Sequence, residues 1–197
     1  MICAVVGTAA AYIRIRKPFL SSKVMELLIG LPYALPGTVL ALAMIFAWME
    51  LIPNWNPGVY GSISILFIAY MTRFLILQMR AGIVAFSQID LSIEEAARTS
   101  GTNGFIKWKK VLLPLLLPGV LSGAFLVFLT ALTELTVSAL LWSSKSQTIG
   151  LVIFNFEQAG YSTYSTAFSS VVVLLIIVGF GLLILLQKVW QRKVIHS

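Results

Sequence analysis

Acidic side chains are the groups in this sequence that could transfer protons or bind cations, and they are few among long apolar runs. Glu94 and Glu95 are adjacent, so on a helix their side chains point to different sides and cannot act as a pair of carboxylates. Glu134 lies inside an apolar run, where an ionisable side chain is costly and is a candidate for function. We predict that Glu134 lines a cation entry path. The alternatives are a carboxylate hydrogen-bonded within a helix bundle, or one that faces water at the outer membrane surface.

The sequence contains no pattern typical of catalysis or of nucleotide binding. It lacks the phosphate-binding loop G-x-x-x-x-G-K-[ST], and it shows no Ser/His/Asp arrangement. Cys3 and His196 are the single cysteine and the single histidine, which excludes an internal disulfide and argues against a metal site. We therefore expect no catalytic residue, no metal and no cofactor. The alternative, a membrane-embedded enzyme, would need clustered polar residues near an interface, and the sequence shows no such cluster.

The composition is typical of a membrane protein. Hydrophobic residues make up 59% of the chain and charged residues 11%, whereas soluble domains carry about 25% charged residues. The formal net charge of +7 could indicate nucleic acid as a partner. The basic residues, however, lie between apolar runs and not along one amphipathic face, so we expect the lipid bilayer as partner and no nucleic acid.

Five apolar stretches predict an all-α, polytopic membrane helix bundle that forms one transmembrane domain over residues 1–197. A membrane span needs about 20 residues. The first stretch, residues 1–13, is shorter than that, so we expect an incomplete first span and a chain truncated at its N-terminus. The other stretches cover residues 25–48, 60–77, 115–142 and 167–186.

The Lys and Arg residues are distributed unevenly over the predicted connections. One side of the membrane holds eleven of them, namely Arg14, Arg16, Lys17, Lys23, Arg98, Lys107, Lys109, Lys110, Lys188, Arg192 and Lys193. The opposite side holds only Lys145. The positive-inside rule therefore predicts that the connection at about 87–113 and the C-terminus are cytosolic. Arg73 and Arg80, seven residues apart inside a span, are expected to reach or anchor its cytosolic end.

The connection at residues 87–113, called the charged loop below, predicts two short helices joined by a glycine. Ser92 and Glu95 have the spacing of a capping box, which starts a helix at Ile93. Gly101 then occupies the position where a left-handed residue ends a helix. The second helix is expected to begin at a cap formed by Thr102 or Asn103 and to have an apolar face formed by Phe105, Trp108 and Leu112.

Helix packing is indicated by prolines and by small residues. The segments 31–37 and 113–119 share the spacing L-P-x-x-L-P-G. We interpret both as helix starts, because proline is tolerated in the first turn; the alternative is a pair of kinked helices whose bends help a gate. Two small faces allow close helix approach, one formed by Gly119 and Gly123 and one by Gly7 and Ala11.

The charged loop resembles the EAA signature of ABC importer permeases, E-A-A-x3-G-x9-I-x-L-P. The match is carried by Glu95, Ala96, Ala97, Gly101, Val111, Leu113 and Pro114, with Val111 replacing the usual Ile. The resemblance implies that a short helix lies parallel to the membrane and fits into a cleft on the ATPase subunit. Ala96 and Ala97 would then allow close approach, Glu95 would supply the charged contact, and Gly101 would permit the sharp turn.

The resemblance extends beyond the loop. The segments LPYALPGTVLALA, QIDLSIEEAARTSG, TELTVSALLW and IGLVIFNFEQAGYSTYSTA resemble the C-terminal half of ferric-iron ABC importer permeases, which often carry two homologous six-span halves. The implied fold is a partial type I importer transmembrane domain in the bacterial inner membrane. The implied partners are a dimer of ABC ATPase subunits, an extracytoplasmic substrate-binding protein, and a second permease domain that is either a homologous half or another copy.

The resemblance also implies a cargo, most directly ferric iron. The alternative cargoes are 2-aminoethylphosphonate, thiamine and polyamines, which are carried by related permeases. A further alternative is that the chain is an inactive fragment of a longer fused permease.

Overall fold

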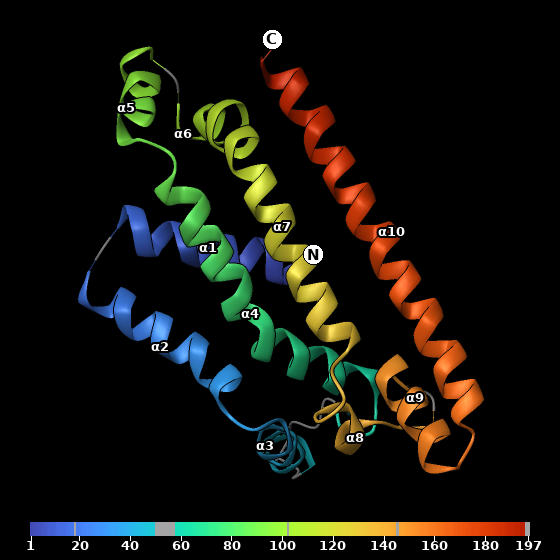
Figure 1. The fold of residues 1–197 in the computed structure, drawn as a ribbon. Helices are drawn as coiled ribbons and strands as arrows, with labels where there is room; N and C mark the ends of the chain where they lie inside the picture. Colours follow the sequence, from blue (N-terminus) through green and yellow to red (C-terminus); the bar gives the residue numbers. More distant parts are fainter. Residues whose placement is uncertain (18, 50–57, 102, 145, 196–197) are drawn as a thin grey trace. The chain divides into compact units, whose positions relative to one another are not determined.

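A computed structural model describes residues 1–17, 19–49, 58–101, 103–144 and 146–195. In this part of the chain all regular elements are helices, as Figure 1 shows, so the expected all-α class is confirmed. Predictions that concern Lys145, Thr102 and His196 fall outside the described residues.

The described part of the chain forms eleven helical elements. They are α1 (Ile2–Arg16), α2 (Leu20–Ala34), α3 (Gly37–Met49), α4 (Ile63–Ser87), α5 (Leu91–Thr99), α6 (Gly104–Lys107), the π-helical turn η1 (Trp108–Leu112), α7 (Leu113–Leu132), α8 (Ser138–Leu141), α9 (Ile149–Gln158) and α10 (Ser162–Ile195).

Within the described residues, three segments are long and apolar enough to cross a membrane: Ile63–Ser87, Gly104–Leu132 and Ser162–Val189. A fourth is added if α2 and α3, which meet at an angle of 105°, count as one span. The stretch at 25–48, expected as one span, is therefore a bent pair of helices. Helix α1 has 15 residues, fewer than the roughly 20 that a span requires.

The chain forms two compact units, each described here by itself. Unit 1 comprises residues 1–26, 75–127 and 178–197, and unit 2 comprises residues 27–74 and 128–177. Helices α2, α4, α7 and α10 each contribute one part to unit 1 and another to unit 2. One transmembrane domain over the whole chain stays a prediction.

Small residues bring the helices of unit 1 close together. A Cβ atom added at Gly119 would lie 2.6 Å from the Ala85 Cβ atom, and one at Gly123 would lie 2.6 Å from the Ala81 Cβ atom. Helix α1 meets α4 in the same way, because a Cβ atom at Gly82 would lie 2.7 Å from the Ala11 Cβ atom. The predicted small faces are thus contact faces of α1, α4 and α7.

In unit 2 the two helices α2 and α3 form an elbow that α4 stabilises. Pro36 precedes α3 and has no N–H to continue α2, which ends at Ala34. Arg73 Nη1 donates hydrogen bonds to the Leu35 carbonyl oxygen at 3.0 Å and to the Pro32 carbonyl oxygen at 3.5 Å. Arg73 therefore binds the free carbonyls of a helix end, and the expectation that it reaches the end of its own span is wrong.

The two L-P-x-x-L-P-G segments differ in structure. The first contains the elbow, and its Pro32 lies near the end of α2 and not at a helix start. The second begins α7, which continues through Pro118 as a single helix to Leu132. The expectation of a helix start thus holds for Pro36, which directly precedes α3. It is wrong for Pro32, which lies inside α2, and for the second segment, because Gly104–Leu132 is one continuous helical segment.

Candidate functional site

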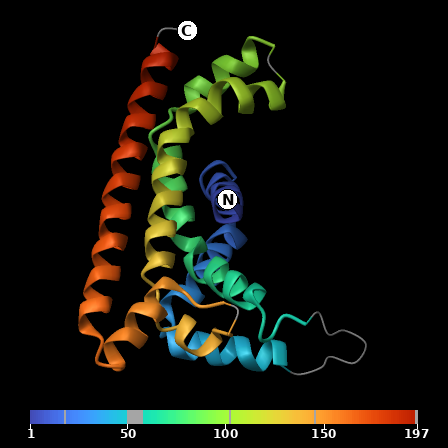
Figure 2. The ribbon, with the colours of Figure 1, turned by 90° about the vertical axis from the view of Figure 1, so that its right-hand side faces the viewer.

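The charged loop forms two short helical segments that lie side by side where α4 ends and α7 begins, as Figure 2 shows. Helix α5 begins at Leu91, and the Asp90 Oδ1 atom accepts a hydrogen bond from the Ser92 backbone N–H at 2.9 Å. This hydrogen bond lowers the pKa of Asp90, which carries its negative charge at the helix start. The predicted cap at Ser92 is therefore wrong by two residues. Asp90 caps the helix, and Ser92 lies inside it.

The turn between the two helices has the expected geometry. Gly101 has a φ of +73°, a left-handed conformation that favours glycine. The Asn103 side chain caps α6, since its Oδ1 atom accepts a hydrogen bond from the Ile106 N–H at 2.9 Å. One of the two expected caps, Asn103, is therefore confirmed.

The expected apolar face of the second helix is only partly formed. Leu112 is fully buried, whereas Phe105 is 76% exposed. Between them the π-helical turn η1 replaces α-helical geometry, and its i→i+5 hydrogen bonds widen the turn. The spacing i, i+3, i+7 therefore does not place all three side chains on one face.

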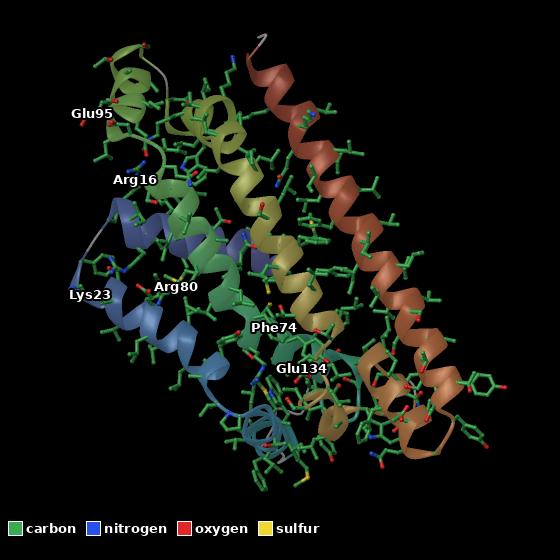
Figure 3. All side chains as sticks on the ribbon, viewed as in Figure 1. Arg16, Lys23, Phe74, Arg80, Glu95 and Glu134 are labelled. Atoms are coloured by element: carbon green, nitrogen blue, oxygen red, sulfur yellow. The ribbon has the colours of Figure 1, made fainter. Side chains whose placement is uncertain are left out.

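The residues that match the EAA signature are spread over α5, the glycine turn, η1 and the first turn of α7. Glu95 and Ala96 are exposed, and Ala97 is half-buried. Figure 3 shows Glu95 on α5 with its side chain directed away from Arg16. Val111 and Pro114 are half-buried, and Leu113 is exposed. The outer side of α5 thus presents one carboxylate beside small side chains.

Glu94, which sequence reasoning did not select, is the buried carboxylate of the loop. It is 7% exposed. Its Oε1 atom lies 2.7 Å from Arg16 Nε, and its Oε2 atom accepts a hydrogen bond from Lys107 Nζ at 2.9 Å. The sequence indicates that Glu94 and Glu95 point to different sides of a helix. It carries no signal for which of them faces inward, because Arg16 is 78 positions away in the chain.

Glu134 is the buried carboxylate of unit 2, with 9% of its surface exposed. Its carboxylate accepts hydrogen bonds from Thr136 Oγ1 at 2.6 Å, from the Val137 N–H at 2.9 Å and from the Ser138 N–H at 3.2 Å. Among the described residues these partners are neutral donors, and they lie at the start of α8. Glu134 therefore holds the break between α7 and α8 together, which agrees with the hydrogen-bonded alternative. Its place on a cargo path stays a prediction.

Comparison with known proteins identifies the family. Residues 4–196 match the family described as binding-protein-dependent transport system inner membrane component. The chain belongs to this family of ABC importer permeases. The fold agrees, because the permease resembles a chain of the MetNI methionine ABC transporter in an inward-facing conformation, with a TM-score of 0.66, 19% identity, and coverage of 97% of this chain and 84% of that one.

Relatives of the permease carry names of several cargoes. It is 29% identical over 170 residues to the ferric transport system permease protein FbpB of Actinobacillus pleuropneumoniae, covering 86% of this chain and 24% of that protein. It is 29% identical over 175 residues to the molybdenum transport system permease protein ModB of Haemophilus influenzae, covering 80% of this chain and 73% of that protein. It is 22% identical over 197 residues to the putrescine transport system permease protein PotI of Escherichia coli, covering 97% of this chain and 69% of that protein. The permease thus spans about a quarter of the ferric relative's length.

Proposed function

We propose that this permease is the membrane-spanning subunit of an ATP-driven importer in a bacterial inner membrane. Its charged loop then faces the cytosol and docks on a separate ATPase subunit, and a binding protein outside the membrane delivers the cargo. The observation that carries the proposal is the exposed outer side of α5, with Glu95 and Ala96 free of contacts that would bury them. A charged surface beside small side chains suits a soluble protein better than a bilayer.

The EAA residues take separate roles in this proposal. Glu95 contacts the ATPase, while Ala96 and Ala97 keep the surface shallow enough for close approach. Gly101 sets the angle at which α5 is presented, because its positive φ is unfavourable for residues with a side chain. Val111, Leu113 and Pro114 belong to η1 and to the start of α7, and they connect the docked helix to a membrane span.

Ferric iron is the cargo that we propose. The similarity to the ferric permease supports it. The similarity to the putrescine permease, which covers 97% of the chain, supports a polyamine as the alternative. Glu134 is proposed to act on the cation path in either case, since a buried carboxylate without a cationic partner among the described residues can attract a positive ion.

The test is accumulation of radioactive ferric iron by iron-starved cells that lack the gene and carry either the wild type or a glycine variant. Gly101→Val and Gly160→Val form a matched pair, because both glycines have a positive φ (+73° and +78°) and no atom within 4 Å of an added Cβ atom. Each substitution carries a similar backbone cost of about 1–2 kcal/mol, but Gly160 lies between α9 and α10, outside the charged loop.

We expect the wild type and Gly160→Val to restore iron accumulation and Gly101→Val not to restore it. Equal accumulation with all three genes would contradict the docking role of the loop. Restoration of putrescine uptake, with iron uptake unchanged by the deletion, would replace iron by a polyamine as the cargo.

A further inference from the structure

The inner face of α5 is fixed to two other elements through the carboxylate of Glu94. Arg16 Nε lies 2.7 Å from Glu94 Oε1, and Lys107 Nζ lies 2.9 Å from Glu94 Oε2. Arg16 is the last residue of α1, and Lys107 is the last residue of α6. Arg16, Glu94 and Lys107, called the ion cluster below, therefore join α5 to the end of α1 and to α6 within unit 1.

Arg16 also holds the chain that leads into α5. Its Nη2 atom donates a hydrogen bond of 2.8 Å to the carbonyl oxygen of Ile89, which lies between α4 and α5. A guanidinium presents its N–H donors in a rigid planar fork, so one side chain can contact a carboxylate and a carbonyl together. Both the entry to α5 and its first turn are thus attached to the end of α1.

Aromatic side chains connect the same elements next to the ion cluster. Tyr12 lies one helical turn before Arg16 on α1. Its ring centroid is 5.6 Å from that of Phe86 on α4 and 5.1 Å from that of Trp108 on η1. Phe86 and Trp108 also pack against each other, at 6.2 Å. The end of α1 therefore cannot shift away from the charged loop without breaking both ionic and aromatic contacts.

The outer face of α5 is different. Neighbouring positions point about 100° apart around an α-helix. Glu94 is buried and Glu95 is exposed. One helix therefore presents one carboxylate to its own chain and the next carboxylate to the surroundings.

We propose that Glu94 is a positioning residue, which transmits the displacement of the docked α5 to α1 through Arg16. This inference rests on the proposed function of the loop as an ATPase contact. Ion pairs suit the task because they hold a fixed geometry, whereas apolar surfaces can slide past each other at little cost. Glu95 then makes the contact with the partner, and Glu94 converts movement of that contact into movement of α1.

The first experiment compares Glu94→Gln with Glu95→Gln in the full assembly of permease, ATPase and binding protein, reconstituted in lipid vesicles with radioactive ferric iron. The readouts are co-purification of the ATPase and the amount of iron imported per ATP hydrolysed. For Glu94→Gln we expect normal co-purification of the ATPase and a fall of about tenfold in the iron imported per ATP hydrolysed. Substitutions that change the coupling between two sites have effects of this size. For Glu95→Gln we expect weaker co-purification and an unchanged ratio in the complexes that remain.

The second experiment needs no transport and so separates this inference from the proposed function. A spin label is placed at Ala96→Cys, which is exposed, in a Cys3→Ser background, with the full permease in lipid nanodiscs. We expect Glu94→Gln to make the label clearly more mobile and Lys107→Met to have a smaller effect, because Arg16 still holds Glu94 in the latter.

Four results would decide between the explanations. An unchanged label mobility in Glu94→Gln would overturn the inference, as would a wild-type ratio of import to hydrolysis. Loss of ATPase co-purification in Glu94→Gln would also overturn it, since Glu94 would then belong to the docking surface. The wild-type assembly could import no iron while Glu94→Gln still makes the label more mobile. This result would reject the proposed iron transport and leave the positioning role of Glu94 intact.

Discussion

Glu94 in unit 1 and Glu134 in unit 2 are carboxylates of nearly equal burial that are stabilised in different ways. Glu94 is placed between two cations, Arg16 and Lys107. Glu134 accepts hydrogen bonds from a hydroxyl and from backbone N–H groups at the start of α8. The first carboxylate joins three separate helices, whereas the second joins residues that are at most four positions apart.

The difference shows how a buried charge can serve either long-range or local structure. Taking a charge out of water is costly, so each carboxylate needs strong partners. When these partners are cations on other helices, the carboxylate joins separate elements, and removal of one cation removes one of these connections. Backbone N–H groups at a helix break satisfy the charge locally, as a helix cap does.

The largest expected effect comes from removing one cation of the ion cluster. Arg16→Leu leaves Glu94 with Lys107 alone and takes the donor away from the Ile89 carbonyl. We expect the free energy of unfolding of the detergent-solubilised permease to fall by about 3 kcal/mol, because a contact between charged groups is lost and the Ile89 carbonyl oxygen loses this donor. Thermal unfolding followed by circular dichroism measures it.

Arg14→Leu is the matched control. Arg14 Nε lies 2.7 Å from Glu26, but Glu26 also pairs with Arg80 at 2.8 Å, and the Arg14 side chain is 28% exposed. We expect a loss of at most about 1 kcal/mol, as for other exposed pairs. Equal losses for Arg14→Leu and Arg16→Leu would show that burial of the ion cluster has no energetic consequence.

A smaller effect is expected at the other carboxylate. Glu134→Gln keeps one oxygen as an acceptor but places an amide group among N–H and O–H donors. We expect a loss of about 2 kcal/mol in the free energy of unfolding, the contribution of hydrogen bonds to a charged group. If Glu134 also lies on the cargo path, iron uptake falls further than stability alone explains, with ATPase co-purification unchanged.

Glu157→Gln is the control for this prediction, because Glu157 is exposed and accepts a hydrogen bond from Ser162 Oγ at 3.1 Å. It should leave both stability and uptake near the wild type. A Glu134→Gln protein with wild-type stability would mean that the neutral donors at the break contribute little.

The smallest effect is expected at Asp90, an exposed carboxylate that also accepts a hydrogen bond from a backbone N–H. The Ser92 hydrogen bonds hold its pKa below the ordinary value of an aspartate. Since the folded-state pKa is lowered, the capping contribution is complete above pH 3.8 and is lost as the pH falls through the lowered value. Hydrogen exchange of the α5 amides should therefore accelerate in acid, and Asp90→Asn should reduce this pH dependence. An identical acid response in Asp90→Asn would assign it to other groups.

Local chemistry explains which features of the fold could be predicted. The apolar runs, the left-handed Gly101, the Asn103 cap and the small faces of α1 and α7 each depend on one residue type and its near neighbours. The cap at Asp90, the π-turn η1 and the elbow could not be placed, because several local arrangements compete within a few residues. The ion cluster could not be predicted because its members are distant in the chain. Their meeting depends on how α1, α5 and α6 pack.

The elbow between α2 and α3 has a consequence for substitutions at Arg73. The carbonyls at the C-terminal end of α2 carry the negative pole of the helix dipole, and this pole, in place of an acidic side chain, balances the guanidinium. In a homologue or a designed variant in which α2 and α3 merged into a straight helix, those carbonyls would accept the backbone hydrogen bonds of the helix itself. The arginine would then have no acceptor. Straightening of the elbow and loss of Arg73 are therefore expected to occur together, as a pair of changes neither of which is tolerated alone.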